Sequence, residues 1–259
     1  MTALLESRDL TLRAGGRSLC EGLRWRAAAG QCWGVLGPNG AGKSTLLRTL
    51  AGLRPADGGT VLLDGRPVAD WPRRDRARRL GMLLQESAPG LPAGVLETVL
   101  AGRHPHLGPW RWEGAEDLDI ARRALAAMDL AGLEARALGT LSGGERQRVR
   151  IAALLAQDPP VTLLDEPLQH LDLRHQRALL ELLRRRTRRP GHVVVMVLHD
   201  PNLARQACSH VLLLPGDGGS IQGAAEEVLT AATLSALYRC PLVEARALLP
   251  RLDTRPPPP

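Results

Sequence analysis

The sequence predicts an α/β fold in which a phosphate-binding core carries an inserted helical segment. A glycine-rich loop at residues 37–45 stands between a buried-strand pattern and the start of a helix. A second apolar run at 161–164 ends in two acidic residues. Between these features, residues 95–136 change to helical periodicity. Because strands that alternate with helices build this class of sheet, we expect the helical segment to interrupt the two halves of one α/β domain.

The elements are expected in the following order. Residues 4–12 and 19–26 indicate two strands joined by a Gly15-Gly16 turn, which gives an antiparallel pair. The apolar run Cys32–Leu36 is typical of a buried strand. The later patterns predict strands at 60–63, 80–84, 161–164, 193–198 and 211–214, and helices at 73–79, 145–156, 173–189 and 226–237.

The loop at residues 37–45 matches the phosphate-binding pattern of Gly, four residues and Gly-Lys-Ser. Glycines are needed because a Cβ would hold the backbone N–H groups away from phosphate oxygens. The positive end of the following helix points at the same place. Lys43 is expected to reach the β- and γ-phosphates, and Ser44 to take a position on Mg²⁺. The residues expected to bind the nucleotide are Gly37, Pro38, Asn39, Gly40, Ala41, Gly42, Lys43, Ser44 and Thr45.

The alternative interpretation of this loop is a glycine-rich turn that happens to contain a lysine. Composition argues against it, because Lys43 is the single lysine among 34 Lys and Arg residues. A compact ammonium fits where a planar guanidinium does not. We therefore expect Lys43 to be a phosphate ligand.

The overall charge and composition exclude some function classes. The net charge is +7, but the arginines at 73–79 and 184–189 lie in amphipathic helical patterns whose charged faces are normally solvated, so nucleic acid is not expected as a partner. The four cysteines form no CxxC pair and are interpreted as small apolar residues of a reducing compartment. No apolar run approaches the ~20 residues that span a bilayer, and no signal pattern opens the chain, which predicts a soluble cytoplasmic protein.

Two acidic residues, Asp165 and Glu166, follow the apolar run at 161–164. This position places their carboxylates at the carboxyl edge of a sheet, where parallel α/β sheets bind ligands. Asp165 is expected to hold Mg²⁺, and Glu166 to orient or deprotonate the water that attacks the γ-phosphorus. The alternative is that the pair caps a helix, as isolated acidic pairs often do.

A second candidate anion site is the stretch Leu141-Ser142-Gly143-Gly144-Glu145. Ser142 and Glu145 have the spacing of a capping box, and a serine with two glycines opens a helix start that attracts anions. One chain then carries two phosphate-seeking helix starts. Since one nucleotide needs only one of them within a subunit, the second predicts a partner chain.

In this order, the motifs resemble those of the ATP-binding subunits of ABC transporters, whose signature is Leu-Ser-Gly-Gly followed by Gln or Glu. The resemblance covers nearly all of residues 1–240. It implies ATP and Mg²⁺ as cofactors, ATP hydrolysis as the activity, and a RecA-like phosphate-loop core with an antiparallel β subdomain. The implied division is a single domain at 1–250, with the α/β core at 1–86 and 158–225, a helical signature subdomain at 87–157, a C-terminal helical segment at 226–250, and a flexible Pro-rich tail at 251–259.

The same resemblance implies a head-to-tail homodimer in which the signature of one subunit closes over the ATP held by the other. It implies nucleotide contacts by Ser142, Gly143 and Gly144 across the dimer. Asp172 falls in the D-loop, which crosses between subunits. Gln85 is the Q-loop residue that touches Mg²⁺ and the attacking water, and His199 is the switch histidine at the γ-phosphate. With these roles, the expected catalytic residues are Lys43, Gln85, Glu166 and His199, and the expected Mg²⁺ ligands are Ser44, Gln85 and Asp165.

One departure from the family concerns the adenine. The family normally has an aromatic residue before the first hairpin turn, and Arg13 and Ala14 stand there in this chain. Adenine would then stack weakly, or on the Arg13 guanidinium. We therefore expect loose discrimination between bases.

Three stretches resemble the ATPases of ferric-siderophore, haem and cobalamin importers: Ala101–Gly108, Leu168–Gln176 and Glu227–Tyr238. His104 and His106 could bind a metal, but two histidines make a poor site, so a loop that docks on a permease is favoured. The expected function is ATP hydrolysis that powers import of such a metal chelate, with integral-membrane permease subunits as partners, a periplasmic binding protein as an indirect one, and a location on the cytoplasmic face of the bacterial inner membrane.

Two alternatives stay open from the sequence, and a third is disfavoured. The solute could be molybdate or another small molecule. The chain could instead be a soluble ABC ATPase that acts on DNA or ribosomes, although related proteins carry coiled-coil insertions or two cassettes. A phosphate-loop kinase or GTPase would have no use for the signature at 141–145.

Overall fold

The computed structural model describes residues 3–85, 93–108 and 111–241. Its strands form a four-stranded sheet of order β2-β1-β4-β5 and a six-stranded sheet of order β10-β9-β3-β8-β7-β6. In the six-stranded sheet, β9, β3, β8, β7 and β6 pair in parallel, each with the next. Strand β10 pairs antiparallel with β9 at the edge of the sheet. The strands are β1 (Ala3–Ala14), β2 (Arg17–Ala28), β3 (Cys32–Leu36), β4 (Gly58–Leu63), β5 (Arg66–Pro67), β6 (Leu80–Leu83), β7 (Val161–Leu164), β8 (Val193–Val197), β9 (His210–Leu213) and β10 (Ile221–Ala224).

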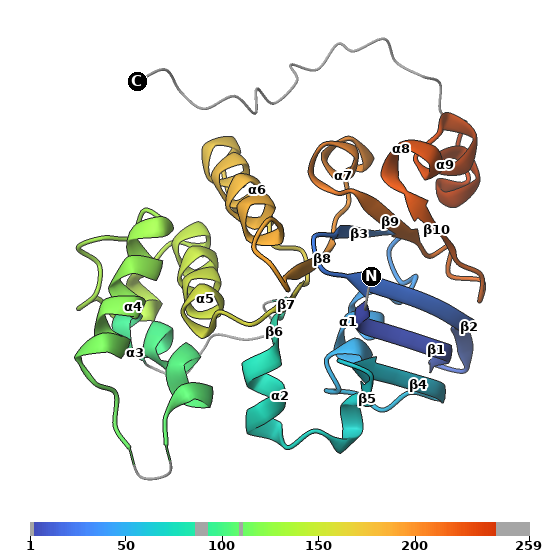
Figure 1. The fold of residues 1–259 in the computed structure, drawn as a ribbon. Coiled ribbons are helices and arrows are strands. Elements are labelled where there is room, and N and C mark those ends of the chain that lie inside the picture. Colours follow the sequence, from blue (N-terminus) through green and yellow to red (C-terminus); the bar gives the residue numbers. More distant parts are fainter. Residues whose placement is uncertain (1–2, 86–92, 109–110, 242–259) are drawn as a thin grey trace.

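The helices occupy the remaining regular segments. Helices α3, α4 and α5 pack together at one end of the molecule, and the four-stranded sheet lies at the other (Figure 1). The α-helices are α1 (Lys43–Leu50), α2 (Arg73–Arg79), α3 (Val95–Leu100), α4 (Ala115–Ala127), α5 (Gly143–Gln157), α6 (Leu173–Thr187), α7 (Pro201–Ala207), α8 (Ala225–Val228) and α9 (Ala231–Tyr238). Short 3₁₀ helices are η1 (Val68–Asp70), η2 (Ala101–His106) and η3 (Leu138–Thr140).

The central strands are buried on both faces, as their continuous apolar runs predict. Alternate side chains of β3 enter different cores, because successive residues of a strand point to opposite faces. Trp33 and Val35 pack with the four-stranded sheet and α1. Cys32 and Leu36 pack with the helices on the other face. The six-stranded sheet is therefore the middle layer, and its strand ends lie between the two cores.

Several boundaries differ from the sequence prediction. The expected helix at 226–237 is two short helices, α8 and α9, which are separated by the fully buried Leu229 and by Thr230, whose side chain caps α9. The helical pattern at 95–136 forms α3, which continues directly into η2, and α4. Residues 242–259, which include the predicted Pro-rich tail, and residues 87–92 of the predicted helical subdomain lie outside the described residues.

Several short elements were not predicted, namely β5, η1, η3, α7 and β10. Helix α7 has a start signal, because Asp200 caps it by accepting a hydrogen bond from the N–H of Asn202 and Pro201 occupies its first turn. Strand β10 has no comparable signal, since it is half exposed and forms only by pairing with β9. Within the described ranges, no helix combines the length and the apolar character that crossing a bilayer requires.

Candidate nucleotide site

The glycine-rich loop connects β3 to α1 in a shape that side chains would prevent. Gly37 has φ 156°, and a Cβ there would lie 2.2 Å from the carbonyl oxygen of Leu214. Gly42 has φ 94° and is the residue from which α1 begins. This left-handed conformation favours glycine. The loop therefore wraps the N-terminus of α1 with backbone N–H groups, as the sequence predicts.

Lys43 folds back over the loop that precedes it. Its Nζ donates to the carbonyl oxygens of Gly37, at 2.8 Å, and Pro38, at 2.9 Å. Burial lowers the pKa of Lys43, and the nearby carboxylates of Glu166 and Asp165 oppose that change. The residue is only 6% exposed. Its ammonium is thus held at the mouth of the loop, where it can exchange these carbonyls for phosphate oxygens.

Ser44 and Asp165 meet although 121 residues separate them. The Ser44 hydroxyl donates to Oδ1 of Asp165 at 3.0 Å. The other carboxylate oxygen, Oδ2, is buried and has no hydrogen-bond partner among the described residues. Burial raises the pKa of Asp165, and the Ser44 hydrogen bond opposes that change.

This pair fits a magnesium ion. A hydroxyl oxygen and a buried carboxylate oxygen without a partner are hard ligands, and Mg²⁺ in nucleotide sites takes one or two such protein ligands together with phosphates and waters. The described residues contain no group of three or more His, Cys, Asp or Glu side chains that would hold a metal alone. The donor set therefore suits a metal that arrives with a nucleotide.

Glu166 stands between two other predicted site residues. Its Oε2 accepts a hydrogen bond from Nε2 of Gln85 at 3.2 Å, and its Oε1 lies 2.8 Å from Nε2 of His199. Glu166 itself has φ 51°, a left-handed conformation that is uncommon outside glycine. Such strained backbone is concentrated at functional sites. The carboxylate is therefore fixed from both sides.

Strand order explains this convergence. Gln85, Asp165 and His199 each lie within two residues of the carboxyl end of a parallel strand, namely β6, β7 and β8, which are neighbours in the sheet. The phosphate loop leaves the end of the next neighbour, β3. Carboxyl ends of parallel strands share one edge, where α/β proteins bind ligands. Side chains from four distant parts of the chain thus reach one place.

A cavity of about 870 Å³ opens at this edge. Its size suits a nucleoside triphosphate. The residues that line it are Ala14, Arg17, Leu19, Asn39, Gly40, Gly42, Lys43, Ser44, Thr45, Gln85, Glu166, Gln169 and His199.

The cavity lining adds a residue to the expectation for the adenine. Ala14 lines the cavity, but Arg13 does not. The backbone N–H of Arg13 instead donates to Oδ2 of Asp57 at 2.8 Å. The arginine at the rim is Arg17, at the start of β2. Arg17 has no local sequence signal for this place, because the path of the chain around the turn decides which side chains line the cavity.

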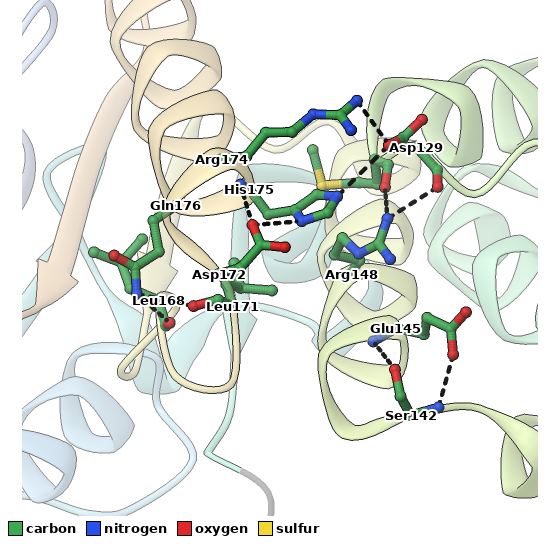
Figure 2. Close-up of polar contacts among 11 residues, drawn as sticks. Asp129, Ser142, Glu145, Arg148, Leu168, Leu171, Asp172, Arg174, His175 and Gln176 are labelled. Atoms are coloured by element: carbon green, nitrogen blue, oxygen red, sulfur yellow. Dashed lines mark hydrogen bonds and ion pairs between the residues drawn. The ribbon is translucent and has the colours of Figure 1, made fainter. Parts of the chain in front are cut away.

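The signature segment has the capping geometry that the sequence predicts. The Ser142 hydroxyl accepts from the N–H of Glu145 at 3.2 Å, and the N–H of Ser142 donates to the Glu145 carboxylate at 2.7 Å (Figure 2). Ser142 is exposed. None of residues 142–144 lines the cavity. The second anion-attracting helix start is thus separate from the first within one subunit.

Asp172 is another predicted nucleotide contact that does not line the cavity, and within the phosphate loop Gly37, Pro38 and Ala41 do not line it either. Asp172 caps α6, and its carboxylate accepts from the N–H of His175 at 2.9 Å (Figure 2). The preceding loop packs closely on the signature helix, since a Cβ at Gly144 would lie 2.7 Å from the carbonyl oxygen of His170. Glycine at this position allows that approach.

Comparison with known proteins gives the following matches. A family model described as "ABC transporter" matches residues 20–169. The chain is 45% identical over 242 residues to the hemin import ATP-binding protein HmuV of Pseudomonas aeruginosa, which covers 91% of this chain and 92% of that protein. It is 39% identical over 245 residues to the ferric enterobactin transport ATP-binding protein FepC of Escherichia coli, covering 93% and 90%.

Solved structures share the fold. A metal-chelate type ABC transporter in an inward-facing conformation matches with a TM-score of 0.79 and 29% identity, over 92% of this chain and 90% of that one. A dimeric ATP-binding cassette bound to ADP and phosphate matches with a TM-score of 0.75 and 26% identity, over 85% and 98%. These matches confirm the predicted fold class, a phosphate-loop α/β core with a β subdomain and an inserted helical subdomain.

Proposed function

Since the chain belongs to the ABC transporter family and is one of its ATP hydrolases, we propose that it powers an importer for a metal chelate of the haem or ferric-siderophore kind. The observation that carries this proposal is the similarity, over nine-tenths of the chain, to relatives named for hemin import and ferric enterobactin transport. Cobalamin belongs to the same group of expected cargoes. The chain itself supplies ATP binding and hydrolysis to a transporter.

The proposed organisation assigns nucleotide binding and the signature motif to different parts of the chain. We propose that residues 1–86 and 158–225 form the nucleotide-binding core and that residues 87–157 form the helical signature subdomain. We also propose a C-terminal helical segment that begins at 226, in which α8 and α9 are the described helices. The close packing of α3, α4 and α5 supports the second unit.

The residues around the cavity have complementary proposed roles. The loop at 37–45 holds the phosphates of ATP through backbone N–H groups, and Lys43 neutralises charge on the β- and γ-phosphates. Ser44, Asp165 and Gln85 would hold Mg²⁺. When bound, that ion would neutralise charge on the transferred phosphoryl group.

Glu166 is the proposed general base. Its carboxylate is held by Gln85 and His199 and faces the cavity beside the phosphate loop. A carboxylate fixed in this way can orient a water and accept its proton as the water attacks the γ-phosphorus in line. His199 then contacts the γ-phosphate from the neighbouring strand end.

The two-subunit site is the second part of the proposal. The cavity is lined by the core alone, whereas Ser142, Gly143 and Gly144 present a separate helix start to solvent. Two copies in head-to-tail arrangement would place this helix start over the other copy's ATP, with Asp172 crossing between them. The similarity to a dimeric cassette supports this arrangement. Closure on ATP would then drive the permease.

The 3₁₀ turn η2 is the proposed contact with the permease. His104 lies 3.3 Å from the Glu113 carboxylate, and the His106 ring nitrogen lies 2.8 Å from the carbonyl oxygen of Gln157. Because the two histidines have separate partners, a docking loop remains favoured over a metal site. The chain would sit at the cytoplasmic face of the bacterial inner membrane, and a periplasmic binding protein would deliver the solute.

The transport assignment is tested by reconstitution. The chain would be purified with its permease, placed in liposomes, and supplied with Mg-ATP and the cognate binding protein. We expect ATP-dependent uptake of haem or a ferric siderophore, measured by radiolabelled iron. Uptake of molybdate alone, or ATP hydrolysis that never couples to a membrane partner, would contradict the assignment.

Base discrimination gives a separate prediction. With Ala14 and an exposed Arg17 at the rim, we expect GTP to compete with ATP within roughly fivefold, because an exposed cation–π contact contributes only about 0.5–1 kcal/mol. Arg17→Ala should weaken both nucleotides about threefold in competition binding. Arg24→Ala, an exposed arginine on the same strand that pairs with Asp9, is the control and should leave both unchanged. A preference for ATP above about a hundredfold would contradict the prediction.

A further inference from the structure

A charged cluster joins the start of α6 to the helices that carry the signature. We call it the bridge cluster, and it consists of Asp129, Arg148, Asp172, Arg174 and His175 (Figure 2). Three of its members, Asp172, Arg174 and His175, belong to the D-loop end of α6. Arg148 belongs to α5, and Asp129 follows Met128, the C-cap of α4. The cluster therefore spans two parts of the molecule that the proposed mechanism requires to act together.

His175 is the central member of the bridge cluster. Its backbone N–H donates to Oδ1 of Asp172, and its ring Nδ1 lies 2.8 Å from the same oxygen. On the opposite edge of the ring, Nε2 lies 3.6 Å from Oδ2 of Asp129. The ring is 19% exposed. One imidazole thus faces a carboxylate on each side.

Asp129 belongs structurally to the helices. It follows α4 with φ 56°, and its carbonyl oxygen accepts a hydrogen bond from Arg148 of α5 at 2.9 Å. The same guanidinium nitrogen also donates to the carbonyl oxygen of Met128. Across the boundary, Arg174 donates to the Asp129 carboxylate at 3.1 Å. Asp129 therefore moves with α4 and α5, while Asp172 moves with α6.

The contact between His175 and Asp129 is incomplete. Nε2 is buried and has no hydrogen-bond partner among the described residues. Its distance to Asp129 is that of an ion pair and exceeds that of a hydrogen bond. A small cavity of about 60 Å³ lies beside the ring and is lined by Met128, Leu171 and Leu179, among others. If the helices moved slightly toward α6, this cavity would give them space, and Nε2, which has no hydrogen-bond partner among the described residues, could bond to Asp129.

We propose that His175 is a positioning residue that couples the signature helices to Asp172. A shift of α4 and α5 is transmitted through Asp129 and the imidazole to the carboxylate of Asp172, so the signature and the D-loop take up their positions over the neighbouring subunit's ATP together. This inference rests on the proposed two-subunit site, since Asp172 crosses to the partner only in that arrangement.

Two amide variants separate coupling from simple helix capping. In His175→Asn the amide nitrogen lies near the position of Nδ1 and reaches only Asp172, whereas in His175→Gln it reaches the position of Nε2 and Asp129. We expect His175→Asn to lower kcat for ATP hydrolysis about fivefold with KM for ATP within twofold of the wild type, because ATP still binds at Lys43. His175→Gln should retain at least half of the wild-type kcat, because its amide reaches Asp129 while its backbone N–H still donates to the carboxylate of Asp172.

A variant of Asp129 completes a double-mutant cycle with His175→Asn. Asp129→Asn should lower kcat to the same extent as His175→Asn, and the double variant should be no slower than either single one, since both remove the same contact. The carboxylate of Asp129 is 60% exposed, so we expect Asp129→Asn to fold normally. The test therefore does not depend on the His175 variants alone, which could have folding defects. Asp119→Asn, which changes another carboxylate on α4 with an arginine partner, is the matched control and should keep full activity.

The outcomes distinguish this inference from the proposed function. A wild-type chain that hydrolyses ATP together with a fully active His175→Asn, or additive losses in the double variant, would overturn the coupling alone. If His175→Gln were slow and His175→Asn normal, His175 would serve only to cap α6, and the coupling would again be wrong. A wild-type chain without ATP turnover would overturn the proposed function and the coupling with it.

Discussion

Glu166→Gln is expected to stop ATP turnover while leaving ATP binding intact. The substitution keeps the shape of the side chain and an oxygen that can accept the hydrogen bond from Gln85, but the neutral amide cannot act as a base toward water. General-base catalysis contributes about 10²- to 10⁴-fold to a rate. We therefore expect kcat to fall roughly a thousandfold, measured as phosphate release under saturating Mg-ATP.

The same variant should also trap the two-subunit state. Because ATP stays intact in both sites, the dimer that closes on it should persist, and sedimentation should show an ATP-dependent dimer of the variant. Glu181→Gln is the matched control, since this carboxylate pairs with Arg185 on the surface of α6, away from the cavity. Normal hydrolysis by Glu166→Gln would show that another group accepts the proton.

Lys43→Ala is expected to abolish activity through loss of nucleotide affinity. The ammonium is buried at the loop, and a charge-assisted hydrogen bond contributes about 1.5–3 kcal/mol. With two phosphates in reach, we expect the affinity for ATP to fall about a hundredfold, measured by fluorescence or calorimetric titration. In contrast with Glu166→Gln, no ATP-dependent dimer should form at micromolar ATP.

Lys43→Arg is a second test of the role of Lys43. The guanidinium is planar and wider than the ammonium that lies between the carbonyl oxygens of Gly37 and Pro38, so it should not restore binding. Arg123→Lys, an exposed substitution on α4, is the control for the exchange of one cation by another. If Lys43→Ala bound ATP within threefold of the wild type, the assigned role of Lys43 would be wrong.

Local motifs in the sequence predict most of the individual parts of the site. The phosphate loop, the acidic pair after β7 and the capping box at Ser142 each depend on residues close in the chain. Their geometry follows from short-range rules about glycine, buried strands and helix caps. The observed loop, strand and cap have the predicted residues at their ends. Such features can be predicted from the sequence because they depend only on residues that are close together in the chain.

Contacts between distant residues needed the tertiary structure. Gln85, Glu166 and His199 meet because β6, β7 and β8 are adjacent in the sheet. This strand order cannot be predicted from the residues of any one of these segments. That Arg17 lines the cavity, whereas Arg13 does not, depends on where the β1 to β2 turn places each side chain. The break between α8 and α9 comes with a fully buried Leu229, which 3.6-residue periodicity does not reveal.

The sequence by itself predicted the phosphate loop and determined that this chain belongs with the ABC ATPases, because those properties reside in short contiguous motifs. Only the tertiary structure decided that Glu166 is held between Gln85 and His199, and that His175 lies between carboxylates of α6 and of the signature helices. Folding fixes such pairs through strand order and helix packing, which depend on the whole chain at once.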